Sequence, residues 1–328
     1  MIRSLRQTAV VVIPTRNEEH TIRGVIAEVR EAFTGLPYDV EVLITDDSTD
    51  ATRAIARECG AHVVNGGGEG LGTAMYRGLK EALYLEPDII LSIDGDGQTD
   101  AKTEIPLFVE PIQQNRADLV LGSRFARSGL VGYRYKSVNM MGTRVLTWIL
   151  RRMTGLPLTD SHGGIRAMVP DVARELQIIG SHTYVQETII DAYEKGFRIL
   201  ELPSVWRKRN FGTSRVVGNI PRYIAYTLPV LLLRSGQHIR ALYALGSLLF
   251  VGAFVVFGIV FVEEGFTLAI GRRTPALIMI ALMVMAGLQL LFFGFSFQLL
   301  KQIKRAVDRL EYDEHVRRPE SSEKLSQS

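Results

Sequence analysis

Cysteine and net charge are the two things that this chain of 328 residues has least of. The one cysteine, Cys59, excludes an internal disulfide framework and fits a reducing compartment. Lys and Arg together number 38 and Asp and Glu 35, so the formal net charge of +3 does not favour a nucleic acid as partner. The first apolar run, 9–13, ends at Pro14 and is too short for a signal peptide.

Common phosphate-binding motifs are also missing. The glycine-rich stretch 66–72 is not followed by Gly-Lys-Ser or Gly-Lys-Thr, which argues against a P-loop. Its glycines do not have the spacing of a dinucleotide-binding fingerprint, and the turn after the first predicted strand carries Pro14 in place of glycines. No internal repeat is visible, which argues against a solenoid.

Short apolar runs alternate with amphipathic stretches over the first part of the chain. The runs that predict buried strands are 9–13, 40–44, 61–64, 89–93 and 119–121. Between the first two, one helical face carries Ile22, Val25, Ile26, Val29 and Phe33, and a further helix is expected near 103–115. This alternation predicts an α/β fold with a mostly parallel sheet that is covered by helices on both faces.

Two carboxylates follow the strand 89–93 directly. Asp94 and Asp96 are separated by Gly95, and Gly97 leaves the chain free to turn, so both side chains can converge on one point. Two carboxylates held that close repel each other unless a cation lies between them. A hard divalent ion takes carboxylate and phosphate oxygens together, so the pattern indicates a metal and diphosphate site at a strand end. A solvated acidic turn is the alternative.

Several motifs together resemble one known family. They are Pro14-Thr-Arg-Asn-Glu18, Asp46-Asp-Ser-Thr-Asp50, Gly70-Leu-Gly-Thr-Ala74, Asp94-Gly-Asp-Gly-Gln98 and Gly122-Ser-Arg124. In order and spacing they resemble the inverting glycosyltransferases of family 2, most closely the polyprenyl-phosphate sugar synthases of the dolichyl-phosphate mannose synthase type. The resemblance continues through 160–166, 186–187, 201–203 and 209–215. It implies a nucleotide-sugar-binding fold of the GT-A type.

The resemblance also implies roles for the acidic motifs. The residues implied in nucleotide-sugar binding are Pro14, Arg16, Glu18, Asp46, Asp47, Asp94 and Asp96. Asp94, Asp96 and Gln98 would hold a divalent metal, Mg²⁺ or Mn²⁺, on the donor diphosphate. A carboxylate suits a ribose diol or a base N–H because it is a strong acceptor. Capping of the following helices is the alternative for Glu18, Asp46 and Asp50.

The resemblance also implies a group of Arg and Lys residues at the site. Of these, Arg124 is expected to be catalytic together with Asp94 and Asp96. The residues expected to bind an acceptor phosphate are Arg124, Arg134, Lys136, Arg209 and Arg215. Arginine pairs with phosphate through two hydrogen bonds. A phosphate monoester loses its second proton near pH ~6, so such an acceptor needs no general base. His162 is expected to be a hydrogen-bonding loop residue, and Arg127, Arg151 and Arg152 a solvated basic surface.

The implied reaction moves a hexose from a UDP- or GDP-linked sugar to a polyprenyl monophosphate with inversion. Another lipid or glycan acceptor and a processive polysaccharide synthase are the alternatives. The second disagrees with the sequence, because no Gln-x-x-Arg precedes Trp206. Intact acidic motifs argue against a non-catalytic scaffold. The sequence leaves the sugar, the nucleotide, the lipid and the oligomeric state open, a homo-oligomer included.

The last third of the chain predicts a membrane anchor. Residues 241–262 carry no charge and as a helix would span about 33 Å, enough for a bilayer core. A second such stretch is 274–300, and basic residues outside the pair place both termini and the catalytic domain on the cytoplasmic side of a cell membrane or endomembrane. The expected organisation is a glycosyltransferase domain 1–215, an amphipathic interface segment 216–239, a transmembrane hairpin 240–300 and a polar tail 301–328, disordered from Glu311.

Overall fold

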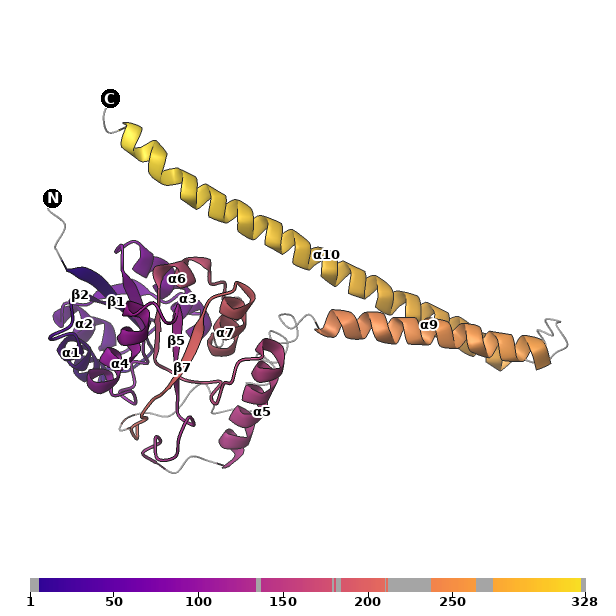
Figure 1. Ribbon diagram of the computed structural model, residues 1–328, viewed down its shortest axis with the longest axis horizontal. Helices are drawn as coiled ribbons and strands as arrows, with labels where there is room; N and C mark the ends of the chain where they lie inside the picture. Colours follow the sequence, from indigo (N-terminus) through magenta and orange to yellow (C-terminus); the bar gives the residue numbers. More distant parts are fainter. Residues whose placement is uncertain are drawn as a thin grey trace. The chain divides into compact units, whose positions relative to one another are not determined.

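The computed structural model describes residues 6–133, 137–178, 180, 184–209, 211, 237–263 and 274–325. The chain divides into two compact units, Met1–Arg234 and Ser235–Ser328. The first is an α/β unit and the second contains two long helices (Figure 1).

Seven strands form one mixed sheet in the order β3-β2-β1-β4-β6-β5-β7. They are β1 (Gln7–Thr15), β2 (Tyr38–Asp46), β3 (His62–Asn65), β4 (Ile89–Ser92), β5 (Leu119–Ser123), β6 (Arg166–Met168) and β7 (Ile199–Pro203). Neighbouring strands pair in parallel, except that β6 runs antiparallel to both β4 and β5. The predicted fold class is confirmed, and the five predicted strands are all present. The sequence did not predict β6 and β7.

The helices cover the sheet on both faces. They are α1 (Ile22–Ala32), α2 (Thr52–Glu58), α3 (Leu71–Leu83), α4 (Ala101–Gln113), α5 (Ser137–Thr154), α6 (Pro170–Glu175) and α7 (Val185–Glu194). Alternate residues of β1 belong to two separate cores: Val11 packs with α1 and α4, and Val12 packs with α3. Because both faces of the central strands are buried, their sequences are apolar without alternation.

The topology brings seven loops to one edge of the sheet. All strands except β6 run in one direction, so their carboxyl ends lie at the same edge. Since β6 is antiparallel, its first residue, Arg166, lies at that edge too, paired with Ser92 and Leu121. Ligands of open α/β sheets bind at this edge.

The second unit is a pair of packed helices, α9 (Gln237–Glu263) and α10 (Thr274–Leu325). The stretches Ile239–Glu263 and Thr274–Leu300 are long and apolar enough to cross a membrane, and little of either is buried within the protein. A Cβ atom added to Gly287 would lie 3.0 Å from the carbonyl oxygen of Gly246, so the two backbones touch. Small residues at such a crossing are typical of membrane helices.

The tail differs from the sequence prediction. Residues from Glu311 were expected to be disordered because they are polar, yet α10 continues to Leu325. Residues 216–236 of the predicted interface segment lie outside the described residues. Residues 264–273, within the predicted hairpin, also lie outside them.

Candidate active site

The loops that follow β1 and β2 are tied together. Asn17 has a positive φ of 55°, which turns the chain back after β1. Its side-chain oxygen accepts a hydrogen bond from Thr49 N at 2.8 Å, and its own N–H donates to Ser48 Oγ at 2.7 Å. Glu18 N donates to Thr52 Oγ1 at 2.8 Å. The motifs 14–18 and 46–50 therefore form one wall of the site.

The two aspartates of the second motif differ in their surroundings. Asp46 is completely buried and accepts hydrogen bonds from Thr15 Oγ1 at 2.7 Å, Ser48 Oγ at 2.5 Å and Arg53 Nε at 3.1 Å. The carboxylate of Asp46 thus ties the two loops together, and its expected part in donor binding stays a prediction. Asp47 is half-buried and accepts from Gly68 N at 2.9 Å, so the glycine-rich loop lies against it.

The first motif lies beside the Asp94 loop. Pro14 is buried at the end of β1, Arg16 is exposed and Glu18 is half-buried. A Cβ atom added to Gly95 would lie 2.8 Å from the Thr15 methyl group and 3.4 Å from Pro14 O. The turn between Asp94 and Asp96 therefore packs directly on the end of β1, where only glycine fits.

Asp94 and Asp96 lie among arginines. Asp96 is buried, and its carboxylate accepts hydrogen bonds from Gln98 N at 3.0 Å and from the Arg209 guanidinium. Burial and the charge of Asp96 raise the pKa of Asp94, while Arg209, Arg166 and Arg124 act in the opposite direction. Two mutually repelling carboxylates, one of them held by a guanidinium, fit a divalent cation.

The chain alone supplies two acidic ligands for such an ion. Among the described residues there is no group of three or more His, Cys, Asp and Glu side chains that could hold a metal. The remaining ligands would be phosphate oxygens of the donor and water. Gln98, the third predicted ligand, is buried, and its amide nitrogen donates to Arg207 O at 3.1 Å. That bond ties the Asp94–Gln98 loop to the segment after β7.

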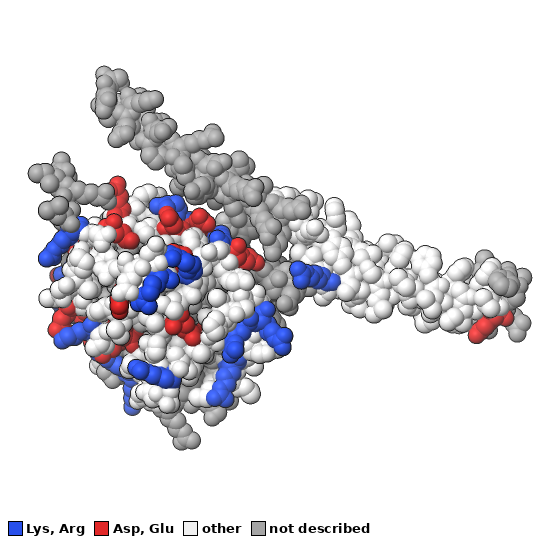
Figure 2. Space-filling view, viewed as in Figure 1, with Lys and Arg blue, Asp and Glu red and all other residues white. Residues whose placement is uncertain are grey.

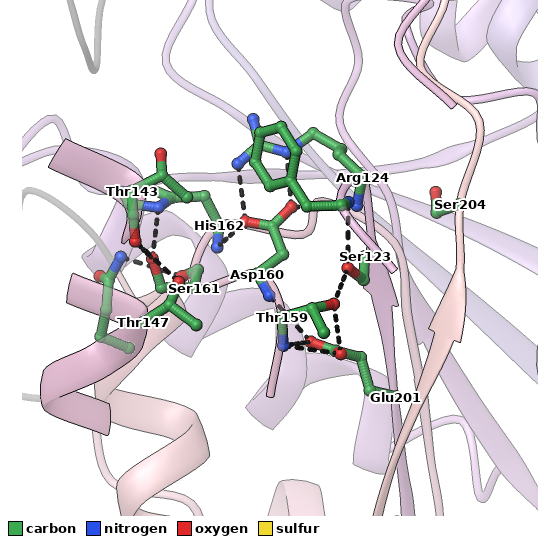
Figure 3. Close-up of polar contacts among 12 residues, drawn as sticks. Ser123, Arg124, Thr143, Thr147, Thr159, Asp160, Ser161, His162, Glu201 and Ser204 are labelled. Carbon is green, nitrogen blue, oxygen red and sulfur yellow. Dashed lines mark hydrogen bonds and ion pairs between the residues drawn. The ribbon is translucent and has the colours of Figure 1, made fainter. Parts of the chain in front are cut away.

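Arg124 forms a buried ion pair with Asp160 (Figure 3). Its Nε donates to Asp160 Oδ2 at 2.6 Å and its Nη2 to Oδ1 at 2.8 Å. Burial alone would raise the pKa of Asp160, but the bonds and charge of Arg124 outweigh it and the pKa is lowered. The guanidinium also lies 4.6 Å from the centre of the Trp206 ring. Arg124 was expected to bind an acceptor phosphate, but in the structure its Nε and Nη2 donate to Asp160.

The loop before β6 packs against the Asp94 carboxylate. A Cβ atom added to Gly164 would lie 2.5 Å from Asp94 Oδ2, and one added to Gly163 would lie 1.6 Å from Gly122 O. Both positions therefore require glycine in this conformation. Burial and the charge of Arg124 lower the pKa of His162 to about 4, so the imidazole is neutral at neutral pH.

Arg166 is a buried cation close to Asp94. Its Nη2 donates to Val185 O at 2.8 Å and its guanidinium lies 5.0 Å from the centre of the Tyr184 ring. Its Nε has no hydrogen-bond partner among the described residues. Burial lowers the pKa of Arg166, and the charges of Tyr184, Asp94 and Asp160 offset part of that effect.

Sequence reasoning gave no role in the site to three residues, although Glu201 lies in the stretch 201–203 that carries the resemblance. Glu201 accepts hydrogen bonds from Thr159 N at 2.8 Å and Asp160 N at 3.0 Å, and so supports the Arg124 partner from below (Figure 3). Trp206 covers Arg124, and Glu104 holds the segment before Trp206. Nothing in their local sequence signals these long-range contacts. Arg134, Lys136 and Arg215 lie outside the described residues.

The fold and the acidic site define a glycosyltransferase of the GT-A type. Residues 10–176 match the model of glycosyl transferase family 2, and the chain belongs to that family. A solved structure of glucosyl-3-phosphoglycerate synthase from Mycobacterium tuberculosis, in complex with Mn²⁺, uridine diphosphate and glucosyl-3-phosphoglycerate, matches with a TM-score of 0.55. That match has 24% identity and covers 70% of this chain and 80% of the other.

Two curated relatives are named for lipid-phosphate substrates. The polyprenol monophosphomannose synthase of Mycolicibacterium smegmatis is 26% identical over 225 residues, 65% of this chain and 82% of the relative. The dolichol-phosphate mannosyltransferase of Pyrococcus furiosus is 30% identical over 222 residues, 63% of this chain and 59% of the relative. These relatives support the resemblance to synthases of the dolichyl-phosphate mannose type.

Proposed function

We propose that this glycosyltransferase moves a hexose from a UDP- or GDP-linked sugar to a polyprenyl monophosphate, with inversion at the anomeric carbon. One observation carries the proposal: a chain with an acidic site ringed by arginines also carries two apolar helices long enough to cross a membrane. An anionic lipid acceptor would be found at a membrane and would need cationic partners. The names of the two lipid-phosphate relatives support the same acceptor class.

Asp94 and Asp96 are the residues that would hold a divalent ion. When bound, that ion would offset charge on the donor diphosphate and on the nucleoside diphosphate that leaves. Pro14, Arg16, Glu18 and Asp47 lie on the adjoining wall, and we assign them to the nucleotide. Asp46 supports that wall from beneath through its bonds to Thr15, Ser48 and Arg53.

The transfer depends on the alignment of the acceptor phosphate with the anomeric carbon, and it does not require a general base. An oxygen of the lipid phosphate, already ionised at neutral pH, attacks the anomeric carbon. The bond from that carbon to the nucleotide oxygen breaks on the opposite face, and the electron pair leaves with the nucleoside diphosphate. The lowered pKa of His162, about 4, makes its imidazole a weak base, and the Asp160 carboxylate is paired with Arg124, which fits a site in which neither group acts as the base.

We assign the acceptor phosphate to Arg134, Lys136, Arg209 and Arg215. In the structure Arg209 lies against Asp96, where it can bridge from the donor side to an incoming phosphate. Arg124 acts as a positioning residue, because its pairing with Asp160 fixes the loop that packs on Asp94.

We further propose that the protein is a multi-pass protein of a cell membrane or endomembrane, with the α/β unit and both termini on the cytoplasmic side. The basic residues that flank the two apolar helices support this orientation. An impermeant thiol reagent should label a cysteine introduced at position 267 from outside intact cells, but not one at 320. The reverse labelling would overturn the orientation.

The substrate assignment is tested with the full chain in detergent. Purified protein is incubated with each of a panel of UDP- and GDP-sugars, with and without a long-chain polyprenyl phosphate. One donor should release nucleoside diphosphate in a lipid-dependent manner. Release that depends on a diacylglycerol or a glycan instead would replace the polyprenyl acceptor by one of the alternatives.

A further inference from the structure

Helix α5 turns an unusual face to the rest of the α/β unit. Its buried positions are Thr143, Thr147, Leu150 and Thr154, which recur at the spacing of one helical face. Two of the hydroxyls are satisfied within the helix: Thr147 Oγ1 donates to Thr143 O at 2.7 Å, and Thr154 Oγ1 to Leu150 O at 2.8 Å. Leu146 and Met153 are half-buried and pack on the same core, so the inward face mixes threonines with large apolar residues.

The outward face of α5 also carries large apolar side chains. Met141 is 64% exposed, Val145 51% and Trp148 58%, and these positions also recur at helical spacing. A surface helix of a soluble domain normally has one apolar stripe, toward the core, and a polar outward face, whereas α5 has a second apolar stripe that is exposed. A contiguous apolar stripe that remains exposed indicates contact with a partner or a membrane.

All charges on this helix are positive. Arg144, Arg151 and Arg152 are exposed, and the sequence 137–154 contains no Asp or Glu. Figure 2 shows blue basic side chains gathered over the region that α5 occupies in Figure 1. The Arg152 guanidinium lies 5.6 Å from the centre of the Trp148 ring. The helix ends at an open pocket lined by Trp148, Arg151, Arg152, Gly155, Leu156 and Pro157.

We propose that the outward face of α5 is a docking surface for an anionic lipid bilayer. Met141, Val145 and Trp148 would enter the boundary between headgroups and acyl chains, where Trp is favoured. The three arginines would bind lipid phosphates at an anionic surface. The open pocket beside Trp148 would take one headgroup.

A bilayer fits this face better than a protein partner for two reasons. The same chain continues into two helices long and apolar enough to span a membrane, and the inference rests on the membrane location proposed above, in which they tether the α/β unit to a bilayer. The uniform positive charge of the face complements anionic lipid. The inference is independent of which sugar or acceptor the enzyme uses.

The experiment uses the full chain in nanodiscs, with the native cysteine removed as Cys59→Ser. An environment-sensitive fluorophore is attached to Val145→Cys, and in a matched variant to Tyr84→Cys, since Tyr84 is also exposed, at 79%. Brominated phosphatidylglycerol should quench the label at 145 and leave the label at 84 unquenched. Brominated phosphatidylcholine should quench the label at 145 less. Replacing Arg144, Arg151 and Arg152 by Gln should reduce quenching at 145 in the anionic discs.

Two results would overturn the proposal. Equal quenching at 145 and 84, or none at either, would mean that the face does not meet lipid. Shielding of the 145 label, together with a disulfide between two chains of the unlabelled Val145→Cys variant, would mean that a second copy covers the face.

Discussion

Arg209 of the segment after β7 donates a hydrogen bond to the carboxylate of Asp96 in the loop after β4. Its guanidinium also lies 3.9 Å from Glu18, and its Nε has no partner among the described residues. A guanidinium thus lies against a carboxylate that we assign to a divalent ion. The two cations would compete for Asp96 until the donor diphosphate arrives.

Competition between Arg209 and the metal ion for Asp96 predicts that removing the Arg209 charge raises the affinity for the ion. Without donor, Arg209→Gln should bind Mn²⁺ more tightly than the wild type, by about tenfold, since about 1.4 kcal/mol of opposing interaction is removed. The free Mn²⁺ signal in electron paramagnetic resonance measures this directly. Arg207→Gln is the matched control, because Arg207 pairs with Glu28 and Asp100 instead. Weaker Mn²⁺ binding in Arg209→Gln would show that Arg209 does not compete with the ion.

A second prediction concerns the buried pair of Arg124 and Asp160. A lysine at position 124 would keep the charge but not the two parallel bonds to the carboxylate. Breaking a buried pair by removing one partner costs about 3–5 kcal/mol, and Arg124→Lys should lose a substantial part of that. Thermal unfolding in detergent should show a Tm several degrees lower. Arg127→Lys, at an exposed position, should leave the Tm unchanged, and equal Tm values for the two variants would contradict a structural role of the pair.

Glu104 predicts a pH dependence of stability. Burial raises its pKa to about 7, although it accepts hydrogen bonds from Ser204 and Val205. The folded state therefore keeps the proton at pH values where the unfolded chain, with a pKa near 4.5, has lost it. This contribution to stability is present below pH 4.5 and is lost as the pH rises to about 7.

Glu104→Gln should remove that dependence, because the amide resembles the protonated acid. The Tm of the wild type minus that of the variant should therefore be larger at pH 5 than at pH 8. The rise of the Glu104 pKa from 4.5 to about 7 corresponds to a stability difference of about 3 kcal/mol at most. A difference that stays constant between the two pH values would mean that Glu104 is ionised throughout in the folded protein.

The helix pair makes a prediction of its own. The Cβ of any larger residue at 287 would press on the backbone of α9, 3.0 Å from Gly246 O, whereas nothing lies within 4 Å of a Cβ at Gly258. Gly287→Leu should separate the helices and cost about 1–3 kcal/mol, while Gly258→Leu should be tolerated. The monodisperse fraction after heating in detergent distinguishes them. Equal behaviour of the two leucine variants would argue against the close crossing.

The sequence predicted the elements that carry a local signal. The continuous apolar run of β4 and the acidic turn after it were readable because strand, glycines and carboxylates are adjacent. β6 was missed because its three residues, Arg166–Met168, begin with a buried arginine whose partners, among them Val185, come from α7. A three-residue strand has too little periodicity to be recognised.

The site was predictable in its acidic half and less so in its cationic half. Asp94 and Asp96 are close in sequence, but the partner of Arg124 is 36 residues away and that of Arg209 is 113 residues away. Only the antiparallel insertion of β6 and the return of the chain after β7 bring these pairs together.

The central claim is tested most directly by isolating the product. Full-length protein is incubated with its active nucleotide sugar and a polyprenyl phosphate, and the lipid fraction is analysed by mass spectrometry and by NMR of the anomeric proton. We predict a sugar monophospho-lipid with inverted anomeric configuration, and no such product from Asp96→Ala. A retained configuration, or nucleotide release with no sugar on the lipid phosphate, would contradict the account.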